Sequence, residues 1–439
     1  MIDVARPRVY AADWVLPVDG EPIEGGGVAV EDGRIVAVGS ADELEGEPRA
    51  FPDAAIVPGL VNAHTHLEYA VYAGFGDGLT FGPWLHTHIE RKSRIGWDEF
   101  VAIAKLGAAE CLASGVTTIG DASFSGAAAV AASKLGLGAV VYLEVFGADP
   151  SRVEELAARI EELEPEVEAG VVVFGVSPHA PYSVSSDVYA AAYALGRPVA
   201  THVAESDDER DYLLRGEGPI AAVTDVEPPG TTSVRHLAAH GLLEPRVVAA
   251  HCVKVDDEEV ALLAEHDVGV AHCPRSNALL GCGIAPLRPL LDAGIRVGLG
   301  TDSPASTPSF DMFEEMRTAV LAARARAERP DALAAVDALE LATLGSARAL
   351  GLEDEIGSLA AGKRADLAVV SLAGSPYLPW EDPTVAVVFG GSPGRVVLTL
   401  VNGEERYGKG GFAWPELRHS ASAARARMLS TEAPLAPKT

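Results

Sequence analysis

The stretch IVPGLVNAHTHLEY, from Ile56 to Tyr69, marks a change of pattern along the chain. Before it, apolar and polar residues alternate around glycines, as in GGGVAVEDGRIVAVGS, which predicts short strands joined by hairpins. After it, short runs rich in valine, alanine and isoleucine alternate with amphipathic segments such as WDEFVAIAKLGAAECLASG. Strands that are apolar throughout and alternate with helices are typical of a parallel sheet covered by helices.

The number of apolar runs predicts how this sheet closes. Eight runs follow one another: AIVPGLVNAHTH, VTTIGDAS, GAVVYLEVFG, GVVVFGVSPHA, RPVATHVAES, RVVAAHCV, DVGVAHCP and IRVGLGTDS. Eight strand–helix units predict an α/β protein with a (β/α)8 TIM barrel. The alternating pattern returns after Leu352, so both chain ends are expected to meet in one small composite β-sandwich. We therefore predict a sandwich from residues 1–55 and 353–412, a barrel over 56–352 and a tail over 413–439.

The composition limits the classes of partner. The 439 residues include 34 lysines and arginines and 63 aspartates and glutamates, which gives a net charge of −29. Such an acidic field disfavours nucleic acid and anionic membranes, but not a small molecule that meets only its own pocket. The start of the sequence lacks an apolar run of signal-peptide type, and no uncharged span is long enough to cross a membrane. These features predict a cytoplasmic protein with a small-molecule partner.

Residues able to do chemistry gather at the ends of the predicted strands. They are His64, His66, Glu68, His179, His202, Glu205, His251, His272 and Asp302, with Asp121 as a weaker candidate. In barrel enzymes the active site is built from the C-terminal ends of the strands. The joint placement of these residues therefore predicts one active site.

His-Thr-His occurs twice, and strand geometry separates the two copies. Residues i and i+2 of a strand share a face, so His64 and His66 can both point into the barrel mouth. His86 and His88 lie in PWLHTHIERKSR, where a helix or a loop is expected. In a helix, residues i and i+2 point about 200° apart. The second pair is therefore expected to be packing or surface histidines.

His202 and Asp302 complete a set of three imidazoles and one carboxylate with the first pair. Such a set suits Zn²⁺ with open positions for water, and Fe²⁺ or Mn²⁺ would also fit. An alternative for Asp302 is a helix N-cap, because TDSPAS is good capping sequence. The run GVVVFGVSPHAPYS contains no lysine that could bridge two metals, so one metal ion is expected.

A metal ion of this kind makes water acidic enough to attack at neutral pH, and nearby groups must then move protons. Glu205 follows His202 by three residues and would lie close to the metal. Its alternative role is an ordinary acid in the first turn of a helix. His251 could orient the water or polarise the substrate, or instead serve as a further ligand or a core residue. His179, between two prolines, would be a rigid donor to the substrate.

The chain resembles the amidohydrolase superfamily over nearly its whole length. The motifs that carry the likeness are PGLVNAHTHLEY, SPHAPYS, THVAES, AHC, HCPRSN, LGTDSPAS and GSLAAGKRADLAVV. Within that superfamily they look like the mononuclear aminohydrolase branch of deaminases and chlorohydrolases. The resemblance implies a barrel with a composite β-sandwich, a homodimer, and one metal held by His64, His66, His202 and Asp302. It also implies that Glu205 and His251 handle protons around the attacking water, with Asp302 as a possible first base.

The motifs HTHLEY, HAPYSVS and HCPRSN look most like those of aminodeoxyfutalosine deaminases, which act in menaquinone biosynthesis. That resemblance implies conversion of 6-amino-6-deoxyfutalosine to futalosine and ammonia. The substrate is an adenine nucleoside that carries an aryl ketone and a carboxylate. Glu68 or Glu90 could accept from the ribose hydroxyls. The candidate cations are Arg91, Lys92, Arg94 and Arg275, and the candidate stacking residues are Trp84, Tyr69 and Phe81.

Other substrates and roles stay open on the sequence alone. Methylthioadenosine and adenosylhomocysteine deaminases have a ribose-binding glutamate at a position that matches Ser93 here, with Glu90 three positions early. Guanine deaminase and chlorohydrolase are further alternatives. A non-catalytic barrel that serves as a scaffold is disfavoured, because every expected ligand and Glu205 are present.

Overall fold

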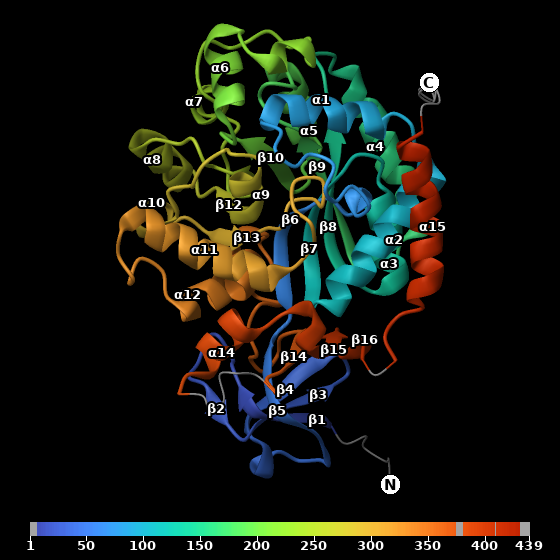
Figure 1. The fold of residues 1–439 in the computed structure, drawn as a ribbon, viewed down its shortest axis with the longest axis vertical. Helices are drawn as coiled ribbons and strands as arrows, with labels where there is room; N and C mark the ends of the chain where they lie inside the picture. Colours follow the sequence, from blue (N-terminus) through green and yellow to red (C-terminus); the bar gives the residue numbers. More distant parts are fainter. Residues whose placement is uncertain (1–6, 375–380, 409, 431–439) are drawn as a thin grey trace.

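Two sheets organise the computed structural model, which describes residues 7–374, 381–408 and 410–430 (Figure 1). One is the parallel sheet of the barrel, and the other combines strands from both ends of the chain. In Figure 1 the barrel occupies the upper part of the molecule and the sheet of the chain ends lies beneath it.

The barrel contains all eight predicted strands, in sequence order. They are β6 (Leu60–Thr65), β7 (Val116–Ser123), β8 (Gly138–Val145), β9 (Val172–Pro178), β10 (Val199–Val203), β11 (Val247–His251), β12 (Gly269–His272) and β13 (Val297–Leu299). The sheet closes where the backbone N–H of Asp302 donates to the carbonyl of His64 over 2.9 Å. The predicted (β/α)8 barrel is therefore confirmed.

Helices and turns link the barrel strands. The helices up to the end of the barrel are α1 (Phe81–Lys92), α2 (Trp97–Ala113), α3 (Ala127–Leu135), α4 (Ser151–Leu163), α5 (Ser186–Ala194), α6 (Asp207–Arg215), α7 (Ser233–Ala239), α8 (Asp257–Glu265), α9 (Pro274–Leu279), α10 (Leu287–Asp292), α11 (Met312–Ala327), α12 (Ala335–Glu340) and α13 (Ser346–Ala349). Several begin at a side-chain cap. The Ser206 hydroxyl accepts from the N–H of Glu209, and Asp256 forms a capping box with Glu259.

The second sheet joins the two chain ends. Its strands are β1 (Arg8–Val15), β2 (Ile23–Glu24), β3 (Gly26–Glu31), β4 (Arg34–Ser40), β5 (Pro48–Pro58), β14 (Leu367–Ser371), β15 (Val396–Val401) and β16 (Glu404–Tyr407). The central pairing is antiparallel and places β5 beside β14, with Ile56 opposite Val369. Strands from both ends enclose an apolar core of their own, which includes Val28 and Leu398.

The boundaries differ in detail from the predicted ones. β5 continues to Pro58, beyond the predicted boundary at residue 55, because its last residues still pair with β14. The C-terminal segment also contains two helices, α14 (Pro383–Gly390) and α15 (Trp414–Met428). α15 lies along α2 in Figure 1, and Arg427 Nη1 is 3.1 Å from Glu99 Oε1. The predicted tail therefore begins with a packed helix, while its last residues, 431–439, lie outside the described part of the chain.

Two further observations place the functional end of the barrel. Small and medium apolar side chains from five strands pack as one cluster inside the barrel; they are Ala63, Val140, Tyr142, Ala200, Val248 and Ala271. α1 crosses the barrel end that faces away from the second sheet (Figure 1).

Among the described residues, no helix combines the length and the apolarity needed to span a bilayer.

Gly300 allows the barrel to close. A Cβ atom at this position would lie 2.8 Å from the carbonyl oxygen of His64 and 2.9 Å from its Cβ. Those distances are too short for a side chain, so β6 and the segment after β13 would have to separate. Gly39, in β4, has open space at the same position.

We therefore predict that Gly300→Ala destabilises the protein by about 1–3 kcal/mol, the usual cost of overpacking a close contact. Gly39→Ala is the matched control and should change stability by less than about 0.5 kcal/mol. Differential scanning calorimetry of the two variants beside the parent measures the difference. Equal melting temperatures for all three proteins would contradict the closure argument.

Candidate functional site

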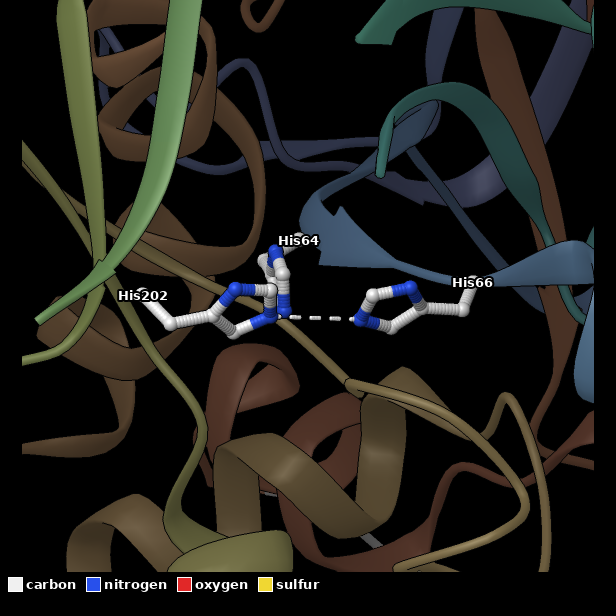
Figure 2. A group of neighbouring side chains, drawn as sticks. All are labelled: His64, His66 and His202. Carbon is white, nitrogen blue, oxygen red and sulfur yellow. Dashed lines mark hydrogen bonds between the residues drawn. The ribbon is translucent and has the colours of Figure 1, made fainter. Parts of the chain in front are cut away.

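Three imidazoles converge at the mouth of the barrel (Figure 2). His64 and His66 come from the end of β6, and His202 comes from β10. His66 Nδ1 lies 2.6 Å from the carbonyl oxygen of Ala122, and His202 Nδ1 lies 2.8 Å from that of His179. A carbonyl only accepts, so each Nδ1 carries the proton and donates it. The lone pairs of the two Nε2 atoms consequently face the centre of the cluster.

The Nε2 lone pairs of these imidazoles face one another, which is unfavourable without a cation between them. Nε2 of His202 lies 3.4 Å from Nε2 of His66, although both atoms are acceptors. Nε2 of His64 is buried without a hydrogen-bond partner among the described residues. Burial and the neighbouring His64 lower the pKa of His66 to about 3, which keeps its imidazole neutral. Neutral imidazoles whose Nδ1 atoms donate to carbonyls are typical metal ligands, so the cluster fits a divalent metal ion.

Asp302 adds one oxygen to this cluster. Its Oδ1 lies 3.4 Å from His66 Nε2 and 3.7 Å from His64 Nε2. Its Oδ2 accepts hydrogen bonds from the hydroxyls of Ser276 (2.6 Å) and Ser306 (2.7 Å). The bonds of Oδ2 come from serine hydroxyls and not from backbone N–H groups, so the N-cap alternative does not describe this residue. Oδ1 is the oxygen that faces the imidazoles.

Glu205 and His251 lie on the other side of Asp302, and groups of all three approach within 4.8 Å. His251 Nε2 is 3.6 Å from Glu205 Oε1. Its Nδ1 is 3.0 Å from the side-chain oxygen of Asn277, which assigns the proton to Nδ1 and leaves the lone pair on Nε2. Burial, with the charge of Asp302, raises the pKa of Glu205 well above its ordinary value. Burial also lowers the pKa of His251 to about 4, so a neutral base stands beside a carboxyl group that favours its protonated form.

The turn after β10 directs Glu205 into the site. Ala204 has a φ of 52°, a left-handed conformation that is costly for a residue other than glycine. Glu209 stabilises the turn, because its carboxylate accepts from the N–H groups of Ala204 (2.9 Å) and Glu205 (2.7 Å). Glu205 precedes the N-cap Ser206 and is therefore outside α6. The first turn of α6 contains other acidic residues, so Glu205 does not have the alternative role of a first-turn helix acid.

The cluster forms the base of a cavity of about 730 Å³, including its open mouth. Of the sequence-predicted substrate residues, Trp84 and His179 line it, together with the possible stacking residues Tyr69 and Phe81. His179 Nδ1 is 2.7 Å from the hydroxyl of Ser183, and the indole N–H of Trp84 donates to the carbonyl of Ala305 over 2.8 Å. Both side chains are therefore held in fixed orientations.

Glu68 and Arg275 do not line this cavity, contrary to expectation. The side chain of Glu68 is buried against the start of α3. Its carboxylate accepts from the Ser123 hydroxyl (2.5 Å) and the N–H of Ala127 (2.9 Å). Arg275 Nη1 lies 3.3 Å from the buried Glu315 Oε1, and Arg275 also pairs with Glu314. Each has a structural role that satisfies its charge, so neither is free to contact a substrate.

α1 contributes a different set of residues from the one expected. Glu90 is exposed and pairs with Arg94, and the Arg91 guanidinium lies 4.6 Å from the centre of the Phe75 ring. Along one face of α1, the expected Trp84 lines the cavity, together with His88 and Lys92. These residues are four apart, the spacing of one helical face, so the sequence contained the signal once the helix was assumed.

The second His-Thr-His behaves as predicted. It lies in α1, where His86 is exposed and His88 is buried. The His88 ring packs 4.4 Å from the ring centre of Tyr69 and 5.4 Å from that of Trp84. The two histidines therefore point in different directions, and only His88 reaches the cavity wall.

Sequence reasoning missed the end of the third barrel strand. Glu144 lies at the end of β8, lines the cavity and is 9% exposed, and Phe146 follows it. Val140 and Tyr142 point into the barrel, so the two-residue period of a strand placed Glu144 on the same face. Lys92 Nζ lies 3.9 Å from the ring centre of Phe124 and 5.2 Å from that of Phe146. Burial raises the pKa of Glu144 to about 8, although the charge of the neighbouring Lys92 offsets part of the rise.

Comparison with known proteins agrees with this arrangement. Residues 55–406 match the model of the amidohydrolase family, and residues 26–47 match an imidazolonepropionase-like composite domain of bacteria. The 5-methylthioadenosine/S-adenosylhomocysteine deaminase of Moorella thermoacetica is 36% identical over 404 residues, which cover 89% of this chain and 91% of the relative. The 5'-deoxyadenosine deaminase of Methanothermobacter thermautotrophicus is 34% identical over 405 residues, covering 88% and 90%.

A solved structure gives the same result. The crystal structure of an adenosine deaminase from Xanthomonas campestris with bound zinc superposes with a TM-score of 0.86 at 29% identity, covering 96% of this chain and 98% of the other. The family match, the identity to these relatives and the shared fold lead to one conclusion. The chain belongs to the amidohydrolase family.

Proposed function

We propose that this protein is a metal-dependent hydrolase that removes the 6-amino group of an adenosine-like nucleoside as ammonia. The observation that carries the proposal is the convergence of three neutral imidazoles and Asp302 beside Glu205 and His251 at the base of one cavity. The relatives named above support the reaction, because all three are deaminases of adenosine or its derivatives.

In this proposal His64, His66, His202 and Asp302 hold one divalent ion, and zinc is the first choice because a structural relative binds it. A divalent metal there lowers the pKa of water and supplies a nucleophile at neutral pH. The neutral Nε2 of His251 would accept a proton from the attacking water, and Asp302 would help to hold that water in place. Glu205 donates its proton to N1 of the purine while oxygen adds to C6. The Glu205 carboxylate would then take the proton of the added hydroxyl and pass it to the amino group, which leaves as ammonia when the C6–N bond breaks. The proton taken up by His251 would finally restore the Glu205 carboxyl group.

For the substrate we propose 6-amino-6-deoxyfutalosine, which would give futalosine in menaquinone biosynthesis. Two features support it besides the motifs. Of the four cations considered in sequence, Lys92 is the one that lines the cavity. Two phenylalanine rings surround its ammonium group, and they suit an aryl carboxylate. S-adenosylhomocysteine is the second candidate, because it also carries a carboxylate and the Moorella relative is named for it. The homodimer and the cytoplasmic location stay predictions.

The first prediction concerns the metal. Purified protein should contain one divalent ion per chain by elemental analysis, and His66→Asn or His202→Asn should lose it because the two remaining imidazoles and Asp302 bind a divalent ion more weakly than the full set. His86→Asn, in the second His-Thr-His, is the matched control and should retain the full content. Loss of metal from the His86 variant, or retention in the other two, would refute the ligand assignment.

The second prediction concerns the reaction. Ammonia release and the absorbance change from aminopurine to hypoxanthine should occur with 6-amino-6-deoxyfutalosine, S-adenosylhomocysteine, methylthioadenosine or adenosine, but not with guanine or a chlorotriazine. Glu205→Gln should lower kcat by about 10²–10⁴-fold, because a general acid is lost. Its metal content should stay at the parent level. A metal-loaded parent that is inactive on all four aminopurines would overturn the proposed function.

The third prediction concerns the carboxylate. Lys92→Met keeps the apolar stem and removes the charge, so kcat/KM for substrates with a carboxylate should fall by about 10–100-fold, the range for a hydrogen bond to a charged group. Methylthioadenosine has no carboxylate, and its kcat/KM should change by less than about 3-fold. Arg91→Met, a cation on the same helix outside the cavity, is the control. Equal losses with both kinds of substrate would exclude Lys92 as the carboxylate receptor.

A further inference from the structure

Glu144 is a buried carboxylate whose oxygens are left without a partner. Its side chain lines the cavity and is 9% exposed, yet it has no hydrogen bond or ion pair with any residue that the structure describes. Three other buried acids near the site have donors: Glu68 at the start of α3, Glu209 at the turn before α6, and one oxygen of Asp302 at two serines. A buried carboxylate without donors costs free energy, so donors from a ligand would stabilise it.

The surroundings of Glu144 argue against a second metal ion. Groups of Glu144, His179 and His202 lie within 4.8 Å of one another. However, His202 Nδ1 donates to the carbonyl of His179, and its Nε2 already faces His64 and His66. Only Glu144 and one nitrogen of His179 remain free, too few for a stable protein site. The missing partner is therefore an organic donor.

The chemistry of an adenosine-like nucleoside identifies that donor. Once C6 and its amino group lie at the metal cluster, the purine presents only ring nitrogens with lone pairs to the rest of the cavity. Burial raises the pKa of Glu144 to about 8, and the charge of the neighbouring Lys92 offsets part of that rise. In its ionised form the carboxylate repels such acceptors. The two ribose hydroxyls are the nearest O–H donors, and one carboxylate can accept from both members of a vicinal diol. The amino group of S-adenosylhomocysteine lies beyond the ribose, farther from His202.

We propose that Glu144 accepts the 2'- and 3'-hydroxyls of the substrate ribose and thereby selects ribonucleosides. The inference rests on the proposed function and extends it to the sugar. It assigns to a barrel strand the role that the sequence had suggested for Glu68 or Glu90. Glu68 is committed to α3, and Glu90 is exposed outside the cavity.

The test compares adenosine with 2',3'-dideoxyadenosine on the zinc-loaded full chain. The parent should prefer adenosine by about 100-fold in kcat/KM, as expected for two hydrogen bonds to a charged acceptor. Glu144→Ala should reduce this preference to less than about 3-fold by lowering activity on adenosine alone, and the isosteric Glu144→Gln should give an intermediate value. Glu90→Gln is the matched control and should keep the full preference. All four proteins should bind the same amount of zinc and melt alike.

Three results would overturn the inference. One is an equal loss of activity on both nucleosides in Glu144→Ala, which would indicate a general structural effect. Another is loss of zinc from that variant, which would indicate a metal ligand. The third is loss of the preference in Glu90→Gln. If the parent deaminates neither nucleoside, the proposed function fails in this assay, and calorimetric titration then measures the same preference as a ratio of Kd values.

Discussion

The orientation of two histidine rings is the constraint on which the site depends. His66 and His202 each donate Nδ1–H to a backbone carbonyl, of Ala122 and His179 respectively. Those carbonyls belong to the barrel and to the loop at its mouth, so the fold itself fixes the ring orientation. Their Nε2 lone pairs are directed at one another across 3.4 Å, a geometry that is unfavourable until a cation enters. The barrel therefore maintains an unfavourable arrangement of acceptors, which a divalent cation would make favourable.

Contacts with their surroundings give Asp302, His251 and Glu205 different roles. Two serine hydroxyls occupy one oxygen of Asp302, so one oxygen is left for the imidazoles. Asn277 fixes the proton of His251 on Nδ1, so its Nε2 stays available as a base. Glu205 is instead placed in a dry environment that favours its protonated form. The surroundings of each group, and not its residue type alone, set its protonation state, as expected where an acid and a base act together.

The sequence predicted the parts of this structure that follow from periodicity. The apolar runs gave all eight barrel strands, and the two-residue period of β6 correctly brought His64 and His66 together. The sequence could not predict which charged side chains are neutralised by partners far away along the chain. Arg275 meets Glu315 of α11, and Glu68 meets the N–H groups at the start of α3, contacts that depend on how distant segments pack. The period of β8 placed Glu144 on the same face as Val140 and Tyr142, but its position in the cavity wall depends on how distant segments pack around it.

The pairing of β5 with β14 has a consequence for the order of events during synthesis. β5 leads through Gly59 directly into β6, the strand that carries the first two histidines, and its partner strand β14 follows only after the whole barrel in the chain. Asp302 likewise follows His64 by most of the length of the barrel. Contacts between such distant segments form late, because the intervening chain must first be closed into a loop. The early histidines are thus synthesised well before Asp302, and the complete cluster of imidazoles and carboxylate can form only once the barrel has closed.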